Sequence, residues 1–148
     1  MLKEFFKKLF NKKPSDSISF KQGFDLTELP VVTLYQGEKK FNFLLDTGSN
    51  SSIIDSNCLE QIEHTPIESE VTLFGLEGNI KDVDACQITL SYKDKDYAYY
   101  YLVSDMKKPF SQIKQETGVN LHGLLGAKFF NTFKYVLDFD ELIAYSKA

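Results

Sequence analysis

The chain has 148 residues, of which 43% are hydrophobic and 26% are charged, so it is long enough to bury a core and is neither a disordered chain nor a repetitive fibre. Its apolar runs are only a few residues long, which is too short for a transmembrane helix. The net charge is −4 and all 17 basic residues are lysines, which argues against a nucleic-acid-binding protein, because bidentate recognition of phosphate or guanine depends on arginine.

The first thirteen residues differ from the rest of the chain in composition and charge. They carry five lysines and one glutamate, a charge of +4, so residues 14–148 carry −8. Apolar side chains recur between the lysines at helical spacing, at Leu2, Phe5, Phe6, Leu9 and Phe10. We expect a basic amphipathic helix that either contacts an anionic membrane surface or docks on its own domain or on a partner. The boundary at Lys13-Pro14 separates an N-terminal helix and linker over residues 1–16 from one domain over residues 17–148.

The same segment and the cysteines bear on localisation. Charges interrupt the uncharged apolar stretch that a secretory signal peptide requires, so we expect no signal peptide. We expect a cytoplasmic protein whose only membrane contact, if it has one, is peripheral and made through residues 1–13. Cys58 and Cys86 lie among apolar residues and are expected to be small buried side chains in a reducing compartment; a disulfide between them is the alternative.

The remaining sequence is mostly of β type. Strands are predicted over 18–26, 31–35, 41–45, 51–54, 71–74, 80–92, 97–103, 135–140 and 142–145. Short helices are predicted over 57–63, from Pro109 to about Glu116 with Gly118 ending the helix, and over 127–133. Many short strands separated by turns predict an all-β barrel or sandwich with a few short helices.

The most informative motif is Asp46-Thr47-Gly48-Ser49. Apolar, strand-like sequence both precedes and follows it, which holds the aspartate on a loop that rises from a buried sheet. Gly48 allows the backbone a tight path, and the hydroxyls of Thr47 and Ser49 can fix the loop and the carboxylate. These are the parts that a positioned carboxylate needs, although aspartate, glycine and serine also favour ordinary turns.

With its flanks, Phe43–Ile54, this segment resembles the catalytic loop of the aspartic peptidases. A second stretch, Leu121–Phe130, resembles the apolar-apolar-glycine element that passes beneath that loop and leads into a short helix in retroviral-type (retropepsin-like) proteases. The glycine-containing turn at 75–79 lies where that family carries a β-hairpin flap. The closing strands from 135 are similar to those of bacterial single-domain members, and the resemblance covers about residues 17–148.

The resemblance implies an all-β, closed or partly open acid-protease barrel and an aspartic endopeptidase. It assigns Asp46 as the catalytic residue, supported in its loop by Thr47, Gly48 and Ser49. It also assigns a structural floor at Leu124, Leu125 and Gly126 and a flap at Phe74, Gly75, Leu76, Glu77 and Gly78. Because the chemistry uses two carboxylates and the chain has one such motif, the second Asp46 is expected from another copy in a homodimer.

The expected substrate is an extended peptide or protein. Its side-chain pockets are expected near Leu44, Ile53, Ile54, Phe74 and Leu124. No metal or other cofactor is expected, because the two histidines and two cysteines do not have metal-site spacing. No nucleic-acid partner is expected either.

Two alternatives remain open at the level of sequence. The same fold could grip extended peptides without cutting them, or an unrelated β-domain could carry the tripeptide by chance. Bacterial members often carry an acidic residue where this chain has His122, which either is a solvent-facing or hydrogen-bonded loop residue or shifts the pH profile of the carboxylates. The flap also lacks an aromatic residue at its tip.

Overall fold

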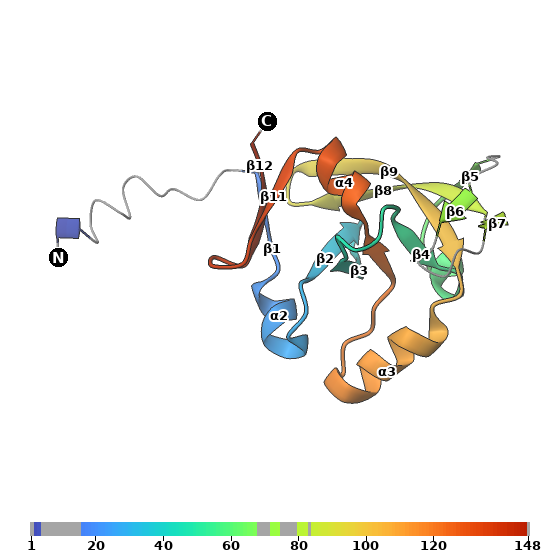
Figure 1. Ribbon diagram of the computed structural model, residues 1–148, viewed down its shortest axis with the longest axis horizontal. Helices are drawn as coiled ribbons and strands as arrows, with labels where there is room; N and C mark the ends of the chain where they lie inside the picture. The colour runs from blue at the N-terminus through green and yellow to red at the C-terminus, as the bar shows by residue number, and fades with distance from the viewer. Residues whose placement is uncertain (1, 4–15, 68–71, 75–79, 83, 148) are drawn as a thin grey trace.

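The computed structural model describes residues 2–3, 16–67, 72–74, 80–82 and 84–147 (Figure 1). The expected N-terminal helix therefore lies almost entirely outside the described residues, as do the expected flap residues Gly75, Leu76, Glu77 and Gly78. Phe74, the remaining flap residue, ends a described strand.

Six strands close into a barrel. In spatial order they are β2 (Val31–Gln36), β3 (Lys39–Leu45), β10 (Gly123–Leu125), β4 (Ile53–Asp55), β9 (Lys95–Ser104) and β8 (Ala85–Tyr92). The barrel closes where Tyr35 of β2 pairs with Ser91 of β8, and the short strand β5 (Thr65–Ile67) extends the sheet beyond β8. The all-β barrel with a few short helices that is expected from the sequence is confirmed.

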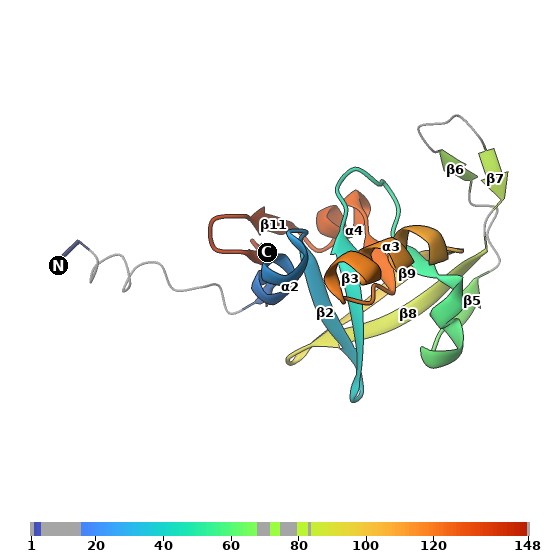
Figure 2. The same ribbon diagram turned by 90° about the horizontal axis from the view of Figure 1, so that it is seen from below.

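Two smaller sheets flank the barrel. One joins the two ends of the domain and has the order β1 (Ser17–Ser19), β12 (Ile143–Ser146) and β11 (Tyr135–Asp138). The other is a hairpin of β6 (Thr72–Phe74) and β7 (Ile80–Asp82), in which Phe74 pairs with Ile80. The hairpin and the sheet of β11 lie at opposite ends of the molecule (Figure 2).

Among the described residues, four short helices connect the strands: α2 (Lys21–Thr27), the 3-10 helix η1 (Ser56–Gln61), α3 (Lys107–Thr117) and α4 (Ala127–Thr132). Helix α3 ends at Gly118 in the left-handed conformation, as expected. The predicted strand over 18–26 is wrong beyond Ser19, because α2 takes its place. Phe20 and Phe24 are four residues apart, and that spacing places both rings on one helix face, where Phe20 is buried and Phe24 packs against the core.

Two apolar clusters fill the fold. The main cluster lies inside the barrel, where alternate residues of β3, Phe41, Phe43 and Leu45, point inward. The second cluster lies on the outer face of the same strands, beneath α3, and centres on Phe110 and Leu124. The strands around the Asp46 loop are therefore packed on both faces.

Candidate active site

Asp46 follows directly after β3, at the start of the loop that leads to β4. Strand β10 lies between these two strands, parallel to β3 and antiparallel to β4. The N–H of Asp46 donates to the carbonyl of Leu125 at 2.9 Å, which continues the β3–β10 ladder by one residue. The start of the loop is thus fixed by a strand about 80 residues further along the chain.

The carboxylate of Asp46 is held by the loop itself. The N–H of Gly48 donates to Asp46 Oδ1 at 3.0 Å, and the N–H of Ser49 donates to the Asp46 carbonyl at 3.2 Å. This is an aspartate turn, in which the side chain takes the place of a backbone acceptor. Thr47 and Gly48 are exposed and Asp46 is half-buried, so the carboxylate lies at the surface of a single chain.

The second half of the loop is held by the turn between β10 and α4. The Ser49 carbonyl accepts from the N–H of Ala127 at 2.7 Å, and the hydroxyl of Ser52, which is only 2% exposed, accepts from the N–H of Gly126 at 3.0 Å. A Cβ on Gly126 would lie 2.5 Å from the Ser51 carbonyl oxygen, so only glycine fits there. The structure thus brings together the residues expected as catalytic loop and as floor.

The four apolar residues of the loop strands that were expected to line substrate pockets are packed inside the fold. Ile54, expected near a substrate pocket, is fully buried in the barrel core and is not available to a substrate. Leu44, Ile53 and Leu124 lie on the other face, packed in the cluster beneath α3. Pocket formation by these four residues cannot be read from apolar character alone, because α3 covers the face that three of them share.

Two other aspartates, Asp55 and Asp138, cap turns. Asp55 is buried, and its Oδ1 accepts from the N–H groups of Asn57 at 3.2 Å and Met106 at 3.0 Å. Asp138 accepts from two N–H groups in the turn between β11 and β12. Within the described part of the chain, neither forms a hydrogen bond with Asp46.

His122 lies at the other end of β10 from the Asp46 loop. Its Nδ1 accepts from the N–H of Asn42 at 2.9 Å, so the proton of the neutral ring is on Nε2. The imidazole ring packs edge-on against the ring of Phe41, with 5.2 Å between the ring centroids. Burial lowers the pKa of His122, and the nearby charge of Asp55 partly opposes this shift. This hydrogen bond agrees with the first of the two sequence interpretations, a hydrogen-bonded loop histidine.

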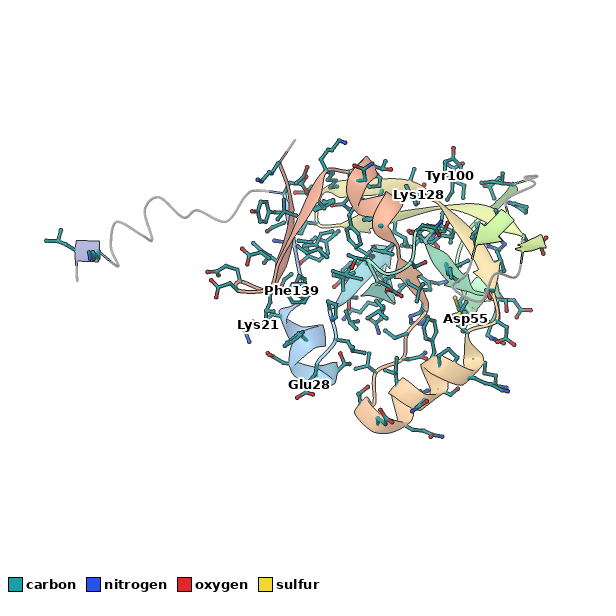
Figure 3. The ribbon with its side chains drawn as sticks, viewed as in Figure 1. Lys21, Glu28, Asp55, Tyr100, Lys128 and Phe139 are labelled. Carbon is teal, nitrogen blue, oxygen red and sulfur yellow. The ribbon has the colours of Figure 1, made fainter. Side chains whose placement is uncertain are left out.

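Sequence reasoning missed two contributors, Ser52 and Lys128. Ser52 is a buried polar residue next to an apolar strand, and its role depends on Gly126, far away in the sequence. Lys128 lines a cavity of about 460 Å³ together with Ser51 and Ser52 at the end of the loop. Figure 3 shows Lys128 and Tyr100 beside one another on the same side of the molecule. The residue type alone could not have distinguished this lysine from the other sixteen.

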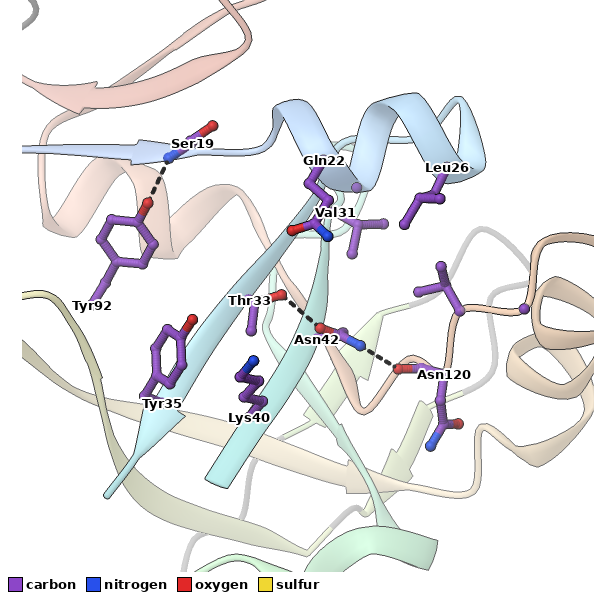
Figure 4. Close-up of a pocket in the computed structure, with 13 residues that line it drawn as sticks. Ser19, Gln22, Leu26, Val31, Thr33, Tyr35, Lys40, Asn42, Tyr92 and Asn120 are labelled. Carbon is purple, nitrogen blue, oxygen red and sulfur yellow. Dashed lines mark hydrogen bonds between the residues drawn. The ribbon is translucent and has the colours of Figure 1, made fainter. Parts of the chain in front are cut away.

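A second cavity, of about 440 Å³, lies between α2, the β2–β3 hairpin and residues 118–120 (Figure 4). Its lining is mostly polar, and Asn42 bridges Thr33 and the Asn120 carbonyl across it, at 2.8 and 2.9 Å. None of its lining residues belongs to the Asp46 loop.

Three other features of the described residues bear on function: metal ligands, reactive cysteines and membrane-spanning helices. No three His, Cys, Asp or Glu side chains among them gather where they could hold a metal ion. Cys58 and Cys86 are free and buried, and burial raises the pKa of each thiol to about 11, with a further contribution from Asp55 at Cys58. In the part of the chain described, no helix is both long and apolar enough to span a membrane.

Comparison with known proteins leaves the family open. No protein-family model matches the chain, and no curated protein matches its sequence significantly. Among solved structures, the EIAV protease complexed with the inhibitor HBY-793 is similar, with 16% sequence identity, a TM-score of 0.48, and coverage of 73% of this chain and 90% of that chain. A likeness at this level concerns the path of the backbone and not the chemistry of a site. Membership of a bacterial branch stays a prediction.

Proposed function

We propose that the chain is an aspartic endopeptidase that acts as a homodimer. The observation that carries the proposal is the position of Asp46. Its carboxylate lies at the end of a barrel strand, is oriented by the N–H of Gly48, and belongs to a loop that Ser52 ties to Gly126. A loop tied down in this way offers the preorganisation that acid–base catalysis requires.

The second carboxylate comes from a second copy. Asp55 and Asp138 are committed to turns, and no other acid in the described residues shares a hydrogen bond with Asp46. A two-fold axis beside the loop places each Asp46 opposite its own copy. The sheet of β1, β12 and β11 leaves β1 and β11 as edge strands, which supports a dimer because an open edge can pair with another chain.

The chemistry then follows from two carboxylates held close together. They cannot both ionise cheaply, so the pair shares one proton, as is established for aspartic-protease dyads. The ionised Asp46 takes a proton from a water that attacks the peptide carbonyl. The protonated Asp46 of the other copy polarises that carbonyl and then donates its proton to the leaving nitrogen. The extended substrate lies between the loop and the β6–β7 hairpin as an added strand.

The direct test is a digest of a peptide library by the wild-type protein and by Asp46→Asn. We expect cleavage favoured at acidic pH for the wild type and none for Asp46→Asn, with unchanged circular dichroism because amide and carboxylate are nearly isosteric. Asp140→Asn is the matched control, since Asp140 is an exposed turn residue. Equal turnover by Asp46→Asn and the wild type would refute the catalytic assignment.

A mixing experiment tests the shared site. When wild-type and Asp46→Asn chains are unfolded, mixed and refolded together, only dimers of two wild-type chains carry both carboxylates. The activity should therefore fall with the square of the wild-type fraction. A fall in simple proportion to that fraction would show that a single chain holds a complete site. Binding of peptides without cleavage by the wild type would instead favour the peptide-binding module.

A further inference from the structure

A cavity of about 460 Å³ opens beside the loop that carries Asp46. Its walls come from four parts of the chain: Ser51 and Ser52 at the end of the loop, Ile67 and Ala85, residues 99–102 of β9, and Lys128 of α4. Ile67 ends β5 and Ala85 begins β8, so these two residues are where the chain leaves for the β6–β7 hairpin and where it returns. The cavity therefore touches the loop and the two strand ends that flank the hairpin in the sequence.

If the proposed function holds, an extended peptide lies between the loop and the hairpin, and one of its side chains reaches this cavity. The apolar side chains on the other face of the loop strands, Leu44, Ile53 and Leu124, pack beneath α3 and so do not line this cavity.

The lining of the cavity is uncharged except for one lysine among the described residues. Apolar and aromatic groups form most of the wall, and Lys128 is the only charged side chain among the described residues that line it. Asp84, next to Ala85 in the sequence, lines a neighbouring cavity and not this one.

Lys128 is also available to a ligand. Its backbone N–H donates to the carbonyl of Asn50 at 3.2 Å, which fixes its position relative to the loop. Its side chain is exposed and, within the described part of the chain, has neither an ion pair nor a hydrogen bond. Tyr100, which is 62% exposed, presents its ring on the same side (Figure 3).

We infer that this cavity binds a carboxylate-bearing residue of the substrate. The Lys128 ammonium is the counter-ion for the carboxylate, and Tyr100 packs against the aliphatic part of the residue. The carboxylate belongs either to an acidic side chain, best a glutamate with its two methylene groups, or to the C-terminus of the peptide. An exposed ion pair of this kind contributes a preference of about two- to fivefold at low ionic strength, and salt reduces it.

The test measures binding, so that it stands apart from catalysis. Labelled peptides from a positional library, in pairs with Glu or Gln at one position and with a free or amidated C-terminus, are titrated against the Asp46→Asn protein by fluorescence anisotropy. We expect one acid form to bind about two- to fivefold more tightly than its neutral pair. Lys128→Met in the same background should abolish this preference. Lys108→Met, which removes a lysine that lines none of the cavities described above, should keep it.

The outcomes separate the two proposals. Loss of a Glu-over-Gln preference in Lys128→Met identifies a side-chain carboxylate, and loss of a free-over-amidated preference identifies the peptide end. A preference that survives Lys128→Met, or no acid preference in any pair, overturns the inference even if the wild type cleaves peptides. A Lys128-dependent preference in a wild-type protein that never cleaves would keep the carboxylate site and refute the peptidase.

Discussion

Gly126→Ala is expected to strain the Asp46 loop. Gly126 has φ −90° and ψ 177°, which alanine adopts freely, so the effect is purely steric. The new Cβ would lie 2.5 Å from the Ser51 carbonyl oxygen and 2.8 Å from that of Ser49, where real contacts are at least 3.0 Å. The loop backbone must therefore retreat by about half an ångström, and backbone cannot rotate away as a side chain can. Overpacking of this kind costs about 3 kcal/mol of the free energy of unfolding.

The assay is urea denaturation followed by far-ultraviolet circular dichroism, because the chain has no tryptophan. The urea curve gives the loss of about 3 kcal/mol directly as a lower free energy of unfolding. In a thermal melt followed by the same signal, it corresponds to a fall in melting temperature of about 10 °C for a domain of this size. Gly118→Ala is the control, since Gly118 has φ +79° and open space around it, so alanine there suffers only backbone strain of about 1 kcal/mol. A Gly126→Ala protein within about 1 kcal/mol of the wild type would refute the view that this glycine is required by close approach.

Three further results are expected. Ser52→Ala leaves the N–H of Gly126 without its buried acceptor and should lower the free energy of unfolding by about 1 to 3 kcal/mol, whereas Ser51→Ala should change it by less than about 0.5 kcal/mol; equal effects would contradict the role of the hydroxyl. Burial lowers the pKa of His122 in the folded protein, so the unfolded chain binds a proton at this residue at a higher pH than the folded protein does. The free energy of unfolding should therefore decline as the pH falls below about 6.5, by at most about 1.4 kcal/mol per pH unit. His122→Gln should flatten this decline in denaturation curves taken across that pH range. With thiol pKa values of about 11, Cys58 and Cys86 should react slowly with a disulfide reagent at mildly alkaline pH until urea is added, and rapid reaction of the folded protein would show that they are not protected.

The elements that sequence predicts well are those with local signals. The β2–β3 hairpin follows from β-branched and aromatic residues on both sides of a short turn, and α3 ends at the glycine that follows it. Helix α2 is missed because Phe20 and Phe24 carry a helical spacing within a composition that favours strands. Gly23 also lowers helix propensity, yet the fold requires it, since a Cβ there would lie 2.2 Å from the Val31 carbonyl oxygen.

The site is predicted only in part, for a physical reason. Asp46 and its loop are recognisable because their parts are contiguous in the sequence. The insertion of β10 between β3 and β4, the covering of Leu44 by α3 and the placing of Lys128 beside the loop all depend on contacts between distant segments. A pattern in one stretch of sequence does not encode such contacts, and they decide which side chains a substrate can reach.

The separation of β3 and β4 by β10 also sets an order of events during synthesis. Phe43 pairs with Gly123, so the strand that positions Asp46 is made 80 residues after the strand that carries it. At ordinary rates of translation this interval is roughly 4 to 16 s. During that time β3 can pair with β2 on one side, but the Asp46 loop lacks both β10 beside it and the floor residues 124–126 beneath it. The candidate site therefore cannot form on a nascent chain until β10 has left the ribosome.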